Sequence, residues 1–258
     1  IGIATIISQL VSFLIILFKV LKNKRVKNIS SEYLVPKFLF FKNIFFQSMP
    51  ISVSICGYAL AAAIIFTYVG QSGEYAVAGY GVGTRIEQVV LLPILGINTA
   101  IISIIAQNYG ANNLVRIKET YFTAIKYAFI IMITAGTLVF LSASVITSFF
   151  SNDPEVIEYG KRYLKISAFV LPAYPVFFLS NGFFMALKKS ENAMISNFFR
   201  NVLNPIAVFY IAKYINASFE TFFWLWVGIN WFFSISYFFI IIYYFKIKLN
   251  KSSTVVHP

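Results

Sequence analysis

Apolar residues fill seven long stretches of this sequence, and short polar breaks separate them. A membrane-spanning helix needs about 20 mostly apolar residues, a length that every stretch reaches. The third, fourth and fifth are longer than one bilayer crossing, so these helices must tilt, kink or project beyond the membrane. The pattern predicts an all-α transmembrane helical bundle with seven spanning helices: Ile1–Leu21, Ile44–Val69, Ala76–Gln107, Val115–Phe150, Val156–Leu187, Glu191–Tyr214 and Phe219–Phe245.

The breaks between the stretches carry residues that favour helix ends. Gly110 predicts the stop of the third helix, because glycine tolerates the backbone conformation that ends helices. Asn152 or Asp153 can cap the fifth helix, and Pro154 fits its first turn, where the missing N–H is not needed. Ser190 can cap the sixth helix. The polar breaks are therefore consistent with the helix count.

Several predicted helices contain proline or paired glycines in their interiors. A proline removes one backbone donor, and it predicts a kink wherever neighbours or water satisfy the freed carbonyl. Bends of this kind recur in transporters, whose helices must move. Gly79 and Gly83 form a Gly-x-x-x-Gly step, which is typical of close helix packing. The interior prolines are Pro93, Pro172, Pro175 and Pro205.

The composition fits a protein embedded in lipid. Hydrophobic residues make up 59% of the chain and charged residues only 12%, against roughly 25% charged residues in soluble domains. The net charge of +12 does not indicate nucleic-acid binding, because basic residues of membrane proteins collect in cytoplasmic loops next to anionic lipid. One cysteine, Cys56, and one histidine, His257, leave little scope for a metal site, a cofactor or enzyme catalysis. A membrane-embedded transferase would need an acidic metal motif or a His-rich site.

The basic residues are distributed unevenly between the two sides of the predicted bundle. Fifteen of the 21 Lys and Arg residues lie on the side of the long linker at 22–43, and four lie on the other side. By the positive-inside rule, the linker and the C-terminal tail at 246–258 are expected to be cytoplasmic. The chain begins at Ile1 inside an apolar run, so we expect a truncated first helix at 1–21 and a sequence that is part of a longer protein.

The third predicted helix carries two charged residues in its middle, Arg85 and Glu87. Glu87 lies about 16 Å from the outer end of the helix at 1.5 Å per residue, which is close to the centre of a ~30 Å hydrocarbon core. A polar side chain at this depth is costly and is a functional candidate by default. Arg85 is on a different face, poorly placed to pair with Glu87. Glu87 is then either an ion-coupling carboxylate or half of a buried pair that locks two helices.

The sixth predicted helix has a denser polar stripe, formed by Asn197, Arg200, Asn201 and Asn204. Spacings of three and four residues place them on one side of the helix. The stripe forms either the wall or gate of a cavity, or a set of helix–helix hydrogen bonds of the kind that Asn provides in membranes. Arg200 is also near mid-depth. We therefore expect Glu87 to face Arg200, or a water-filled cavity with Asn201 or Asn204, rather than lipid.

Four segments together resemble the multidrug and toxic compound extrusion (MATE) family. The stretch Gly79–Gln88, which continues through Leu91–Gly96 to Gln107–Ala111, looks like the eighth helix of bacterial MATE transporters. Three further segments agree with the family pattern. They are Met49-Pro50, which opens the preceding helix, Phe149–Ile157, which looks like the turn before the tenth helix, and Gly182–Lys188, which resembles the small-residue end of that helix.

The resemblance implies twelve helices in two six-helix lobes. Residues 1–21 would be the last helix of the N-terminal lobe, 22–43 the linker between the lobes, and 44–245 the C-terminal lobe. Family members export small cationic or amphipathic compounds across the bacterial inner membrane in exchange for H⁺ or Na⁺, so the expected partners are the missing N-terminal lobe, such a substrate and lipid. The closest alternative is a lipid-linked saccharide flippase of the same wider superfamily, in which we would expect more basic residues in the cavity.

Some family members carry acidic residues at two positions where this sequence has none. The position eight residues after the proline of the seventh helix is Tyr58, and Ala173–Phe177 in the tenth helix contains no acid. The candidates for ion coupling or buried charge are therefore Glu87, Arg85 and Arg200. The candidates that line a cavity are Tyr58, Gln88, Asn98, Tyr174, Asn181, Asn197, Asn201 and Asn204.

Overall fold

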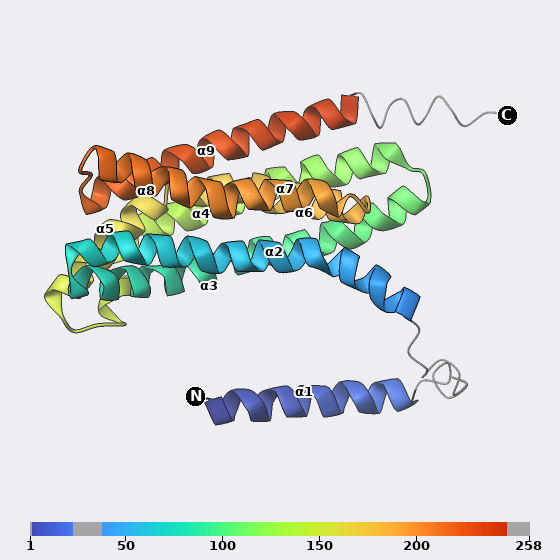
Figure 1. Ribbon diagram of the computed structural model, residues 1–258, viewed down its shortest axis with the longest axis horizontal. Helices are drawn as coiled ribbons and strands as arrows, with labels where there is room; N and C mark the ends of the chain where they lie inside the picture. Colours follow the sequence, from blue (N-terminus) through green and yellow to red (C-terminus); the bar gives the residue numbers. More distant parts are fainter. Residues whose placement is uncertain (1, 23–37, 247–258) are drawn as a thin grey trace. The chain divides into compact units, whose positions relative to one another are not determined.

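The computed structural model describes residues 2–22 and 38–246, and every regular element within these ranges is helical (Figure 1). The chain divides into two compact units, Ile1–Ser48 and Met49–Pro258. Residues 23–37 of the predicted linker and 247–258 of the predicted tail lie outside the described residues. The predicted end of the linker at residue 43 is wrong, because α2 begins at Phe38. The elements in order are α1 (Gly2–Lys22), α2 (Phe38–Val69), η2 (Gly70–Ser72), α3 (Glu74–Gly110), α4 (Leu114–Ser148), α5 (Pro154–Ser167), η3 (Leu171–Ala173), α6 (Tyr174–Ala186), α7 (Ser190–Phe198), η4 (Phe199–Leu203), α8 (Asn204–Tyr214) and α9 (Phe219–Tyr244).

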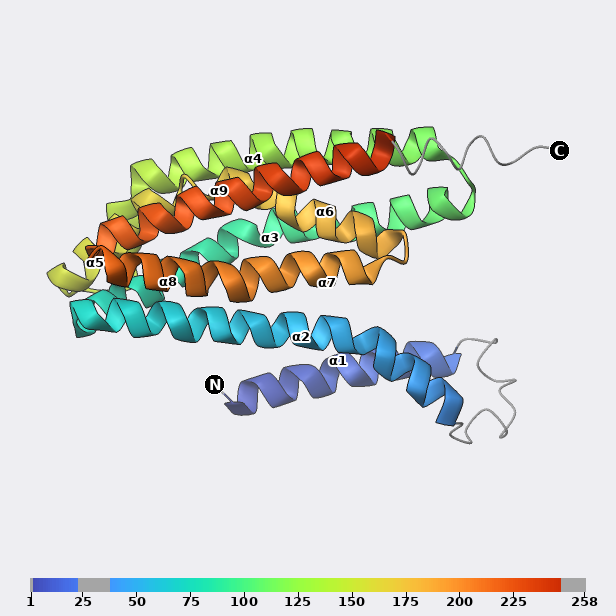
Figure 2. The same cartoon turned by 45° about the horizontal axis from the view of Figure 1, so that its top comes forward.

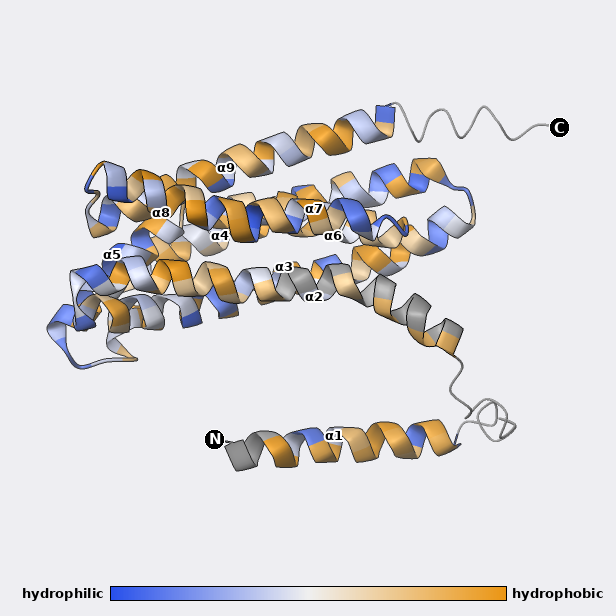
Figure 3. Ribbon diagram, in the orientation of Figure 1, coloured by the Kyte–Doolittle hydropathy of each residue, from blue (hydrophilic) through white to orange (hydrophobic). Residues whose placement is uncertain are grey.

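These elements follow the seven predicted stretches. α5 and α6 together occupy the fifth stretch, and α7, η4 and α8 occupy the sixth. Figure 3 shows apolar residues along most of the helices and polar residues concentrated at their ends. By length and composition, four of the described passes can cross a membrane: Glu74–Gly110, Leu114–Ser148, Pro154–Ala186 and Phe219–Tyr244. The prediction of an all-α membrane bundle is confirmed, and the chain is a multi-pass membrane protein.

The fifth pass is interrupted where its prolines lie. α5 ends at Ser167, a 3₁₀ turn covers Leu171–Ala173, and α6 begins at Tyr174. Because Pro172 has no N–H, the α-helical hydrogen-bond ladder cannot continue through this segment. The predicted kink is therefore a 3₁₀ distortion that divides one pass into two α-helices.

Side chains of α9 satisfy carbonyl groups near this distortion. The indole Nε1 of Trp231 donates to the carbonyl of Phe169 at 2.8 Å, and the hydroxyl of Ser234 donates to the carbonyl of Ala173 at 3.0 Å. An unpaired carbonyl inside a bilayer costs several kcal/mol, so irregular backbone persists there only with such partners. The packing of α9 against α6 thus keeps the distortion stable.

The sixth pass contains a π-helical turn. α7 leads into the five-residue turn Phe199–Leu203, and α8 follows with Pro205 in its first turn. Figure 2 shows α7 and α8 as one continuous rod. π turns arise where a helix accommodates an extra residue, and they are frequent at functional sites. This one carries Arg200 and Asn201, both of them buried.

The predicted helix ends are only partly correct. The Asp153 side chain caps α5 by accepting from the backbone N–H groups of Glu155 and Val156, as expected. Ser190 is instead the first residue of α7, because Lys189 occupies the cap position. Gly110 is the last helical residue of α3, and the positive φ of 54° that follows belongs to Asn112.

The helix α3 packs against α4, α5 and α6, and the close approach to α5 depends on glycine. A Cβ atom added to Gly79 would lie 2.7 Å from the backbone N of Gly160 and 2.8 Å from the carbonyl oxygen of Val156. A Cβ on Gly83 would overlap the ring of Tyr163. The Gly-x-x-x-Gly step therefore lets α5 lie directly on α3, which confirms the predicted close packing.

Candidate functional site

Glu87 of α3 is the acceptor of two tyrosine hydroxyl groups. The hydroxyl of Tyr163 on α5 donates to Oε2 of Glu87, and the hydroxyl of Tyr174 on α6 donates to Oε1 at 2.6 Å. Both tyrosines are 6% exposed. Each carboxylate oxygen thus has a donor from a different segment of the interrupted fifth pass.

The two tyrosines lie on either side of the 3₁₀ turn in the fifth pass. Tyr163 and Tyr174 are eleven residues apart, which would separate them by about 16 Å along a continuous helix. Eleven residues complete about three helical turns, so the two side chains lie on one face of the pass. Both hydroxyl groups reach the carboxylate of Glu87 from that face.

Arg200 of the π turn lies on the other side of this cluster. Its Nη1 donates to the hydroxyl of Tyr58 at 3.3 Å, and its Nε donates to Oδ1 of Asn230 at 3.4 Å. The guanidinium carbon lies 4.2 Å from the ring centre of Phe177 and 4.9 Å from that of Tyr174. Aromatic faces and two polar partners surround this buried guanidinium group.

Glu87 and Arg200 line the same cavity, which has a volume of about 200 Å³. Helices α2, α3, α5, α6 and α9 and the π turn supply its walls. Six of the predicted site residues line it: Tyr58, Glu87, Gln88, Tyr174, Arg200 and Asn201. The structure therefore brings together residues from helices that are far apart in the sequence, with one acidic and one basic side chain on the wall.

Glu87 and Arg200 do not form an ion pair. Within residues 2–22 and 38–246, the ion pairs join Lys161 and Arg162 to Glu158, and Arg162 to Glu220, close to the start of α5 and α9. Arg85 is exposed on α3 and points to a different face from Glu87, as predicted. The partners of the carboxylate are thus hydroxyl groups, which a bound ion could displace more easily than a guanidinium group.

The remaining predicted residues lie outside the wall of this cavity. Asn181 of α6 donates to Oδ1 of Asn197 at 3.1 Å and accepts from the hydroxyl of Tyr237 at 3.1 Å, so these residues join α6, α7 and α9. The Oδ1 of Asn98 packs against Gly182 of α6. Asn204 is fully buried, and neither of its side-chain polar atoms has a hydrogen-bond partner among the described residues.

Tyr163 and Asn230 are not among the residues that the sequence pattern predicts for the site. Tyrosine is common in this chain, with 16 residues, so residue type alone carries no signal for Tyr163. Asn230 did have a signal, since it is a lone amide in the middle of a long aromatic helix, and such residues in membrane helices are functional candidates. It anchors Arg200 and donates back to the carbonyl of Trp226 at 2.8 Å.

The cluster is suited to a proton or a small monovalent cation. A carboxylate flanked by two hydroxyl groups offers oxygen ligands, which hard cations prefer. In the part of the chain that the structure describes, no three His, Cys, Asp or Glu side chains gather into a group that could hold a metal ion. One titratable carboxylate in an apolar bundle can switch between charged and neutral states, and this is the chemistry that the cavity provides.

We expect Tyr163→Phe to weaken the fold of the protein. The substitution removes one of two donors to the carboxylate, and a hydrogen bond to a charged group contributes about 1.5–3 kcal/mol. The purified protein in detergent should therefore unfold at a lower temperature. Tyr210→Phe, on the exposed face of α8, is the control. Equal unfolding temperatures of the two variants would contradict the hydrogen bond to Glu87.

Comparison with known proteins identifies the family. The family model described as MatE matches residues 50–210, which is more than half of the chain. The chain belongs to the MatE family. The resemblance of the α3 segment to MATE transporters is thereby confirmed, and this MatE chain is related to transporters rather than to enzymes.

Relatives of this MatE chain are longer than the chain itself. It is 26% identical over 225 residues to the probable multidrug resistance protein YpnP of Bacillus subtilis, covering 87% of this chain and 48% of the relative. It is 25% identical over 158 residues to the FAD transporter of Shewanella oneidensis, covering 61% and 35%. A MATE crystal structure in complex with MaL6 aligns with a TM-score of 0.85 at 22% identity, over 96% of this chain and 56% of that one. The chain thus spans about half, or less, of the length of these relatives.

Proposed function

We propose that this chain forms the C-terminal lobe, and the last helix of the N-terminal lobe, of a multidrug exporter. The exporter moves small organic cations or amphipathic compounds out of the cell by alternating access, in exchange for H⁺ or Na⁺. The observation that carries the proposal is Glu87, a membrane-embedded carboxylate held by two hydroxyl groups on the wall of a cavity. The family and the names of its multidrug relatives support the same reading.

The contacts of Glu87 favour ion coupling over a structural lock. A lock requires a strong, permanent partner, and breaking a buried ion pair costs about 3–5 kcal/mol. Glu87 instead accepts from two hydroxyl groups. Each hydroxyl can rotate to donate or to accept, so the cluster tolerates both the ionised and the protonated carboxylate. Binding of the ion at Glu87 would then change the charge of the cavity without breaking the packing of α3 on α5.

The transport cavity of the whole protein is proposed to lie between two lobes, of which this chain supplies one. The missing N-terminal lobe is then the main protein partner, and lipid surrounds both. On this view the chain alone does not transport. Vesicles that contain only residues 1–258 should show no ion-driven dye uptake, and they serve as the negative control for the experiment below.

The experiment that tests the function uses the full-length protein reconstituted in liposomes. A fluorescent cationic dye is followed while a proton gradient or a Na⁺ gradient is applied separately, each across otherwise identical vesicles. Uptake driven by one of the two ions supports the proposal and identifies the coupling ion. Dye movement that is independent of both gradients would reject coupled antiport.

The alternative, a lipid-linked saccharide flippase, is less well supported. Its substrate would carry a diphosphate, which calls for several basic side chains in the cavity. Among the described residues that line the cavity, Arg200 is the one basic residue, and Glu87 offsets its charge. Flipping of a fluorescent lipid-linked sugar in the same vesicles, with no dye transport, would favour the alternative.

The linker at 22–43 and the C-terminus are proposed to face the cytoplasm, in the inner membrane of a bacterium. We expect cysteines placed at Lys27 and Ser252 to react in intact cells with a membrane-permeant maleimide, but not with an impermeant one. The reason is the distribution of Lys and Arg, fifteen on that side against four on the other. A cysteine at Asn216, in the turn between α8 and α9, should show the opposite behaviour. Impermeant labelling at 27 and 252 would invert the topology.

A further inference from the structure

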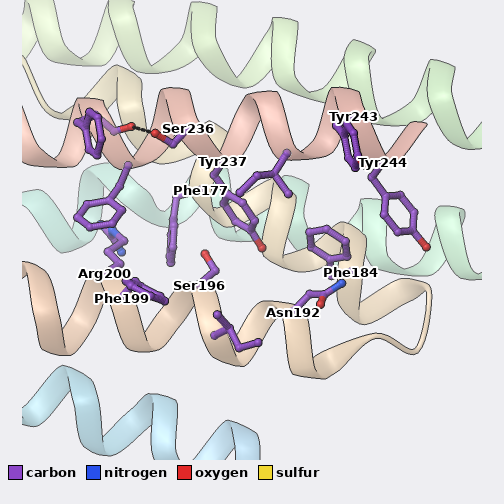
Figure 4. A pocket seen from close by; sticks show the side chains of 14 residues that line it. Phe177, Phe184, Asn192, Ser196, Phe199, Arg200, Ser236, Tyr237, Tyr243 and Tyr244 are labelled. Carbon is purple, nitrogen blue, oxygen red and sulfur yellow. Dashed lines mark hydrogen bonds between the residues drawn. The ribbon is translucent and has the colours of Figure 1, made fainter. Parts of the chain in front are cut away.

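A second and larger cavity, of about 450 Å³, is lined by α6, α7, the π turn and α9, and it shares Arg200 with the Glu87 cavity. We call it the α7–α9 groove. Figure 4 shows aromatic side chains along its whole length. It is lined by Phe177, Phe184, Asn192, Ile195, Ser196, Phe199, Arg200, Phe232, Phe233, Ser236, Tyr237, Ile240, Tyr243 and Tyr244. Its volume is in the range of small-molecule sites, which is about 300–1,000 Å³.

The groove opens to the outside of the bundle. Phe232, Ile240 and Tyr243 are 68%, 53% and 62% exposed. Because α9 is one of the helices that can cross the membrane, these side chains lie at the depth of the lipid chains. The outer edge of the groove is therefore apolar, and no described residue of this chain covers it.

The length of the groove corresponds to one leaflet. Along α9 it extends from Phe232 to Tyr244, which is about 18 Å at 1.5 Å per residue. One half of a ~30 Å hydrocarbon core is about 15 Å. Asn192 and Tyr244 lie at one end of the groove and Arg200 at the other (Figure 4). The groove thus runs from the ends of α7 and α9, at the membrane surface, to the middle of the bilayer.

The surface end of the groove is basic. The Nζ of Lys189 lies 4.8 Å from the ring centre of Tyr244, a residue of the groove wall. Lys188 precedes it in the turn between α6 and α7, and Lys246 follows the end of α9; both are exposed. Glu191, in the first turn of α7, is the acid nearby in sequence. Three lysines against one carboxylate give this end a positive charge.

The deep end is closed by Arg200, which also lines the Glu87 cavity. Its guanidinium group is stacked on Phe177 and bonded to Tyr58 and Asn230. It is 8% exposed, so these partners cover most of its surface. An apolar chain can therefore occupy the groove up to this point without entering the ion site.

We propose that the α7–α9 groove binds an anionic phospholipid. One acyl chain lies along the aromatic wall, and the phosphate of the headgroup contacts Lys188, Lys189 and Lys246. Basic pockets between membrane helices bind anionic headgroups, most of all on the cytoplasmic side, where this end is proposed to lie. The lipid is a resident of the lobe, bound beside α9 and Arg200, and it is distinct from the exported substrate.

Native mass spectrometry of the full-length protein in detergent tests the headgroup contact. Phosphatidylglycerol and phosphatidylcholine are titrated separately, and binding of the first lipid molecule is measured. The triple variant Lys188→Gln/Lys189→Gln/Lys246→Gln should bind phosphatidylglycerol more weakly, by about fivefold for each lysine removed. The matched control is Arg116→Gln/Lys118→Gln/Lys126→Gln, which removes three exposed charges of α4. Equal losses in both triple variants would mean diffuse surface attraction and would overturn the site.

A second variant tests the acyl-chain position independently. Ser236 lines the groove and is half-buried, so Ser236→Trp should fill the groove and remove the first bound phosphatidylglycerol. Ser142→Trp, on α4, should retain it. Retention of the lipid by Ser236→Trp would overturn the proposal, because the chain would then lie elsewhere or other residues of the protein would cover the groove. Displacement of the lipid by the cationic dye ethidium would also overturn it, by assigning the groove to the exported substrate.

Discussion

Glu87→Gln is expected to lower ion-driven export strongly while leaving the protein folded. Glutamine has nearly the same shape as glutamate, and its carbonyl can still accept from one of the two hydroxyl groups of Tyr163 and Tyr174. Glutamine carries no charge and takes up no proton, so the charge of the cavity stays the same throughout transport. A coupling free energy between ion and substrate is typically about 1–3 kcal/mol, which corresponds to about 5–150-fold in affinity. We expect a loss of gradient-driven dye transport of this size.

The pH dependence of substrate binding gives this prediction a second readout. A cationic substrate and a proton compete for the same carboxylate, so wild-type affinity for the substrate should rise as the pH increases and Glu87 becomes ionised. In Glu87→Gln this rise should vanish, because the competing proton has no site. Isothermal titration of the purified protein at several pH values measures both slopes.

Glu74→Gln is the matched control for Glu87→Gln. Glu74 is an exposed acid in the first turn of the same helix, so its replacement changes the net charge equally without touching the cavity. Both transport and its pH dependence should remain at the wild-type level in this control. If Glu87→Gln transports as well as Glu74→Gln, then Glu87 has a structural role and the ion is coupled elsewhere, in the N-terminal lobe.

The helical layout could be predicted from hydropathy because each pass follows one physical rule, the need to bury about 20 apolar residues in lipid. Helix α9 shows this well, since its predicted and observed bounds differ by one residue at the C-terminal end. The internal structure of the fifth and sixth passes was harder to predict from the sequence. Pro172 and Pro205 indicate distortion, but whether a helix kinks, breaks or forms a π turn depends on neighbouring donors. At Phe169 and Ala173 those donors come from α9, about 60 residues away in the sequence.

The candidate site was only half predictable for a related reason. Glu87 and Arg200 are conspicuous because charges at mid-membrane are rare. Of their hydrogen-bond partners, Tyr58 and Tyr174 were predicted to line a cavity, whereas Tyr163 and Asn230 were not predicted. Glu87 was expected to face Arg200, or a cavity with Asn201 or Asn204. Arg200 and Asn201 line the cavity with Glu87, and Asn204 does not. The hydrogen bond from Tyr163 to Glu87 requires that α5 lie close to α3. In the sequence, only the glycine step at Gly79 and Gly83 indicates this close approach.

The closeness of that approach leads to the second large effect, which we expect from Gly79→Ala. The added Cβ would lie 2.7 Å from the backbone N of Gly160 and 2.8 Å from the carbonyl oxygen of Val156. Backbone atoms of a helix cannot move aside alone, so α3 and α5 must separate along their contact. Overpacking of this kind costs about 1–3 kcal/mol. The separation would also draw Tyr163 away from Glu87, so both the unfolding temperature and dye transport should fall.

Gly81→Ala, two residues further along α3, isolates the effect of the contact from that of the substitution. A Cβ at Gly81 meets no atom within 4 Å, and alanine favours a helix over glycine by about 0.8–1.0 kcal/mol. This variant should therefore be as stable as the wild type or slightly more stable, with unchanged transport. Thermal unfolding of the two variants side by side measures the difference. If Gly79→Ala is as stable as Gly81→Ala, then α3 and α5 do not meet at Gly79. That result would also contradict the hydrogen bond from Tyr163 to Glu87, which depends on this contact.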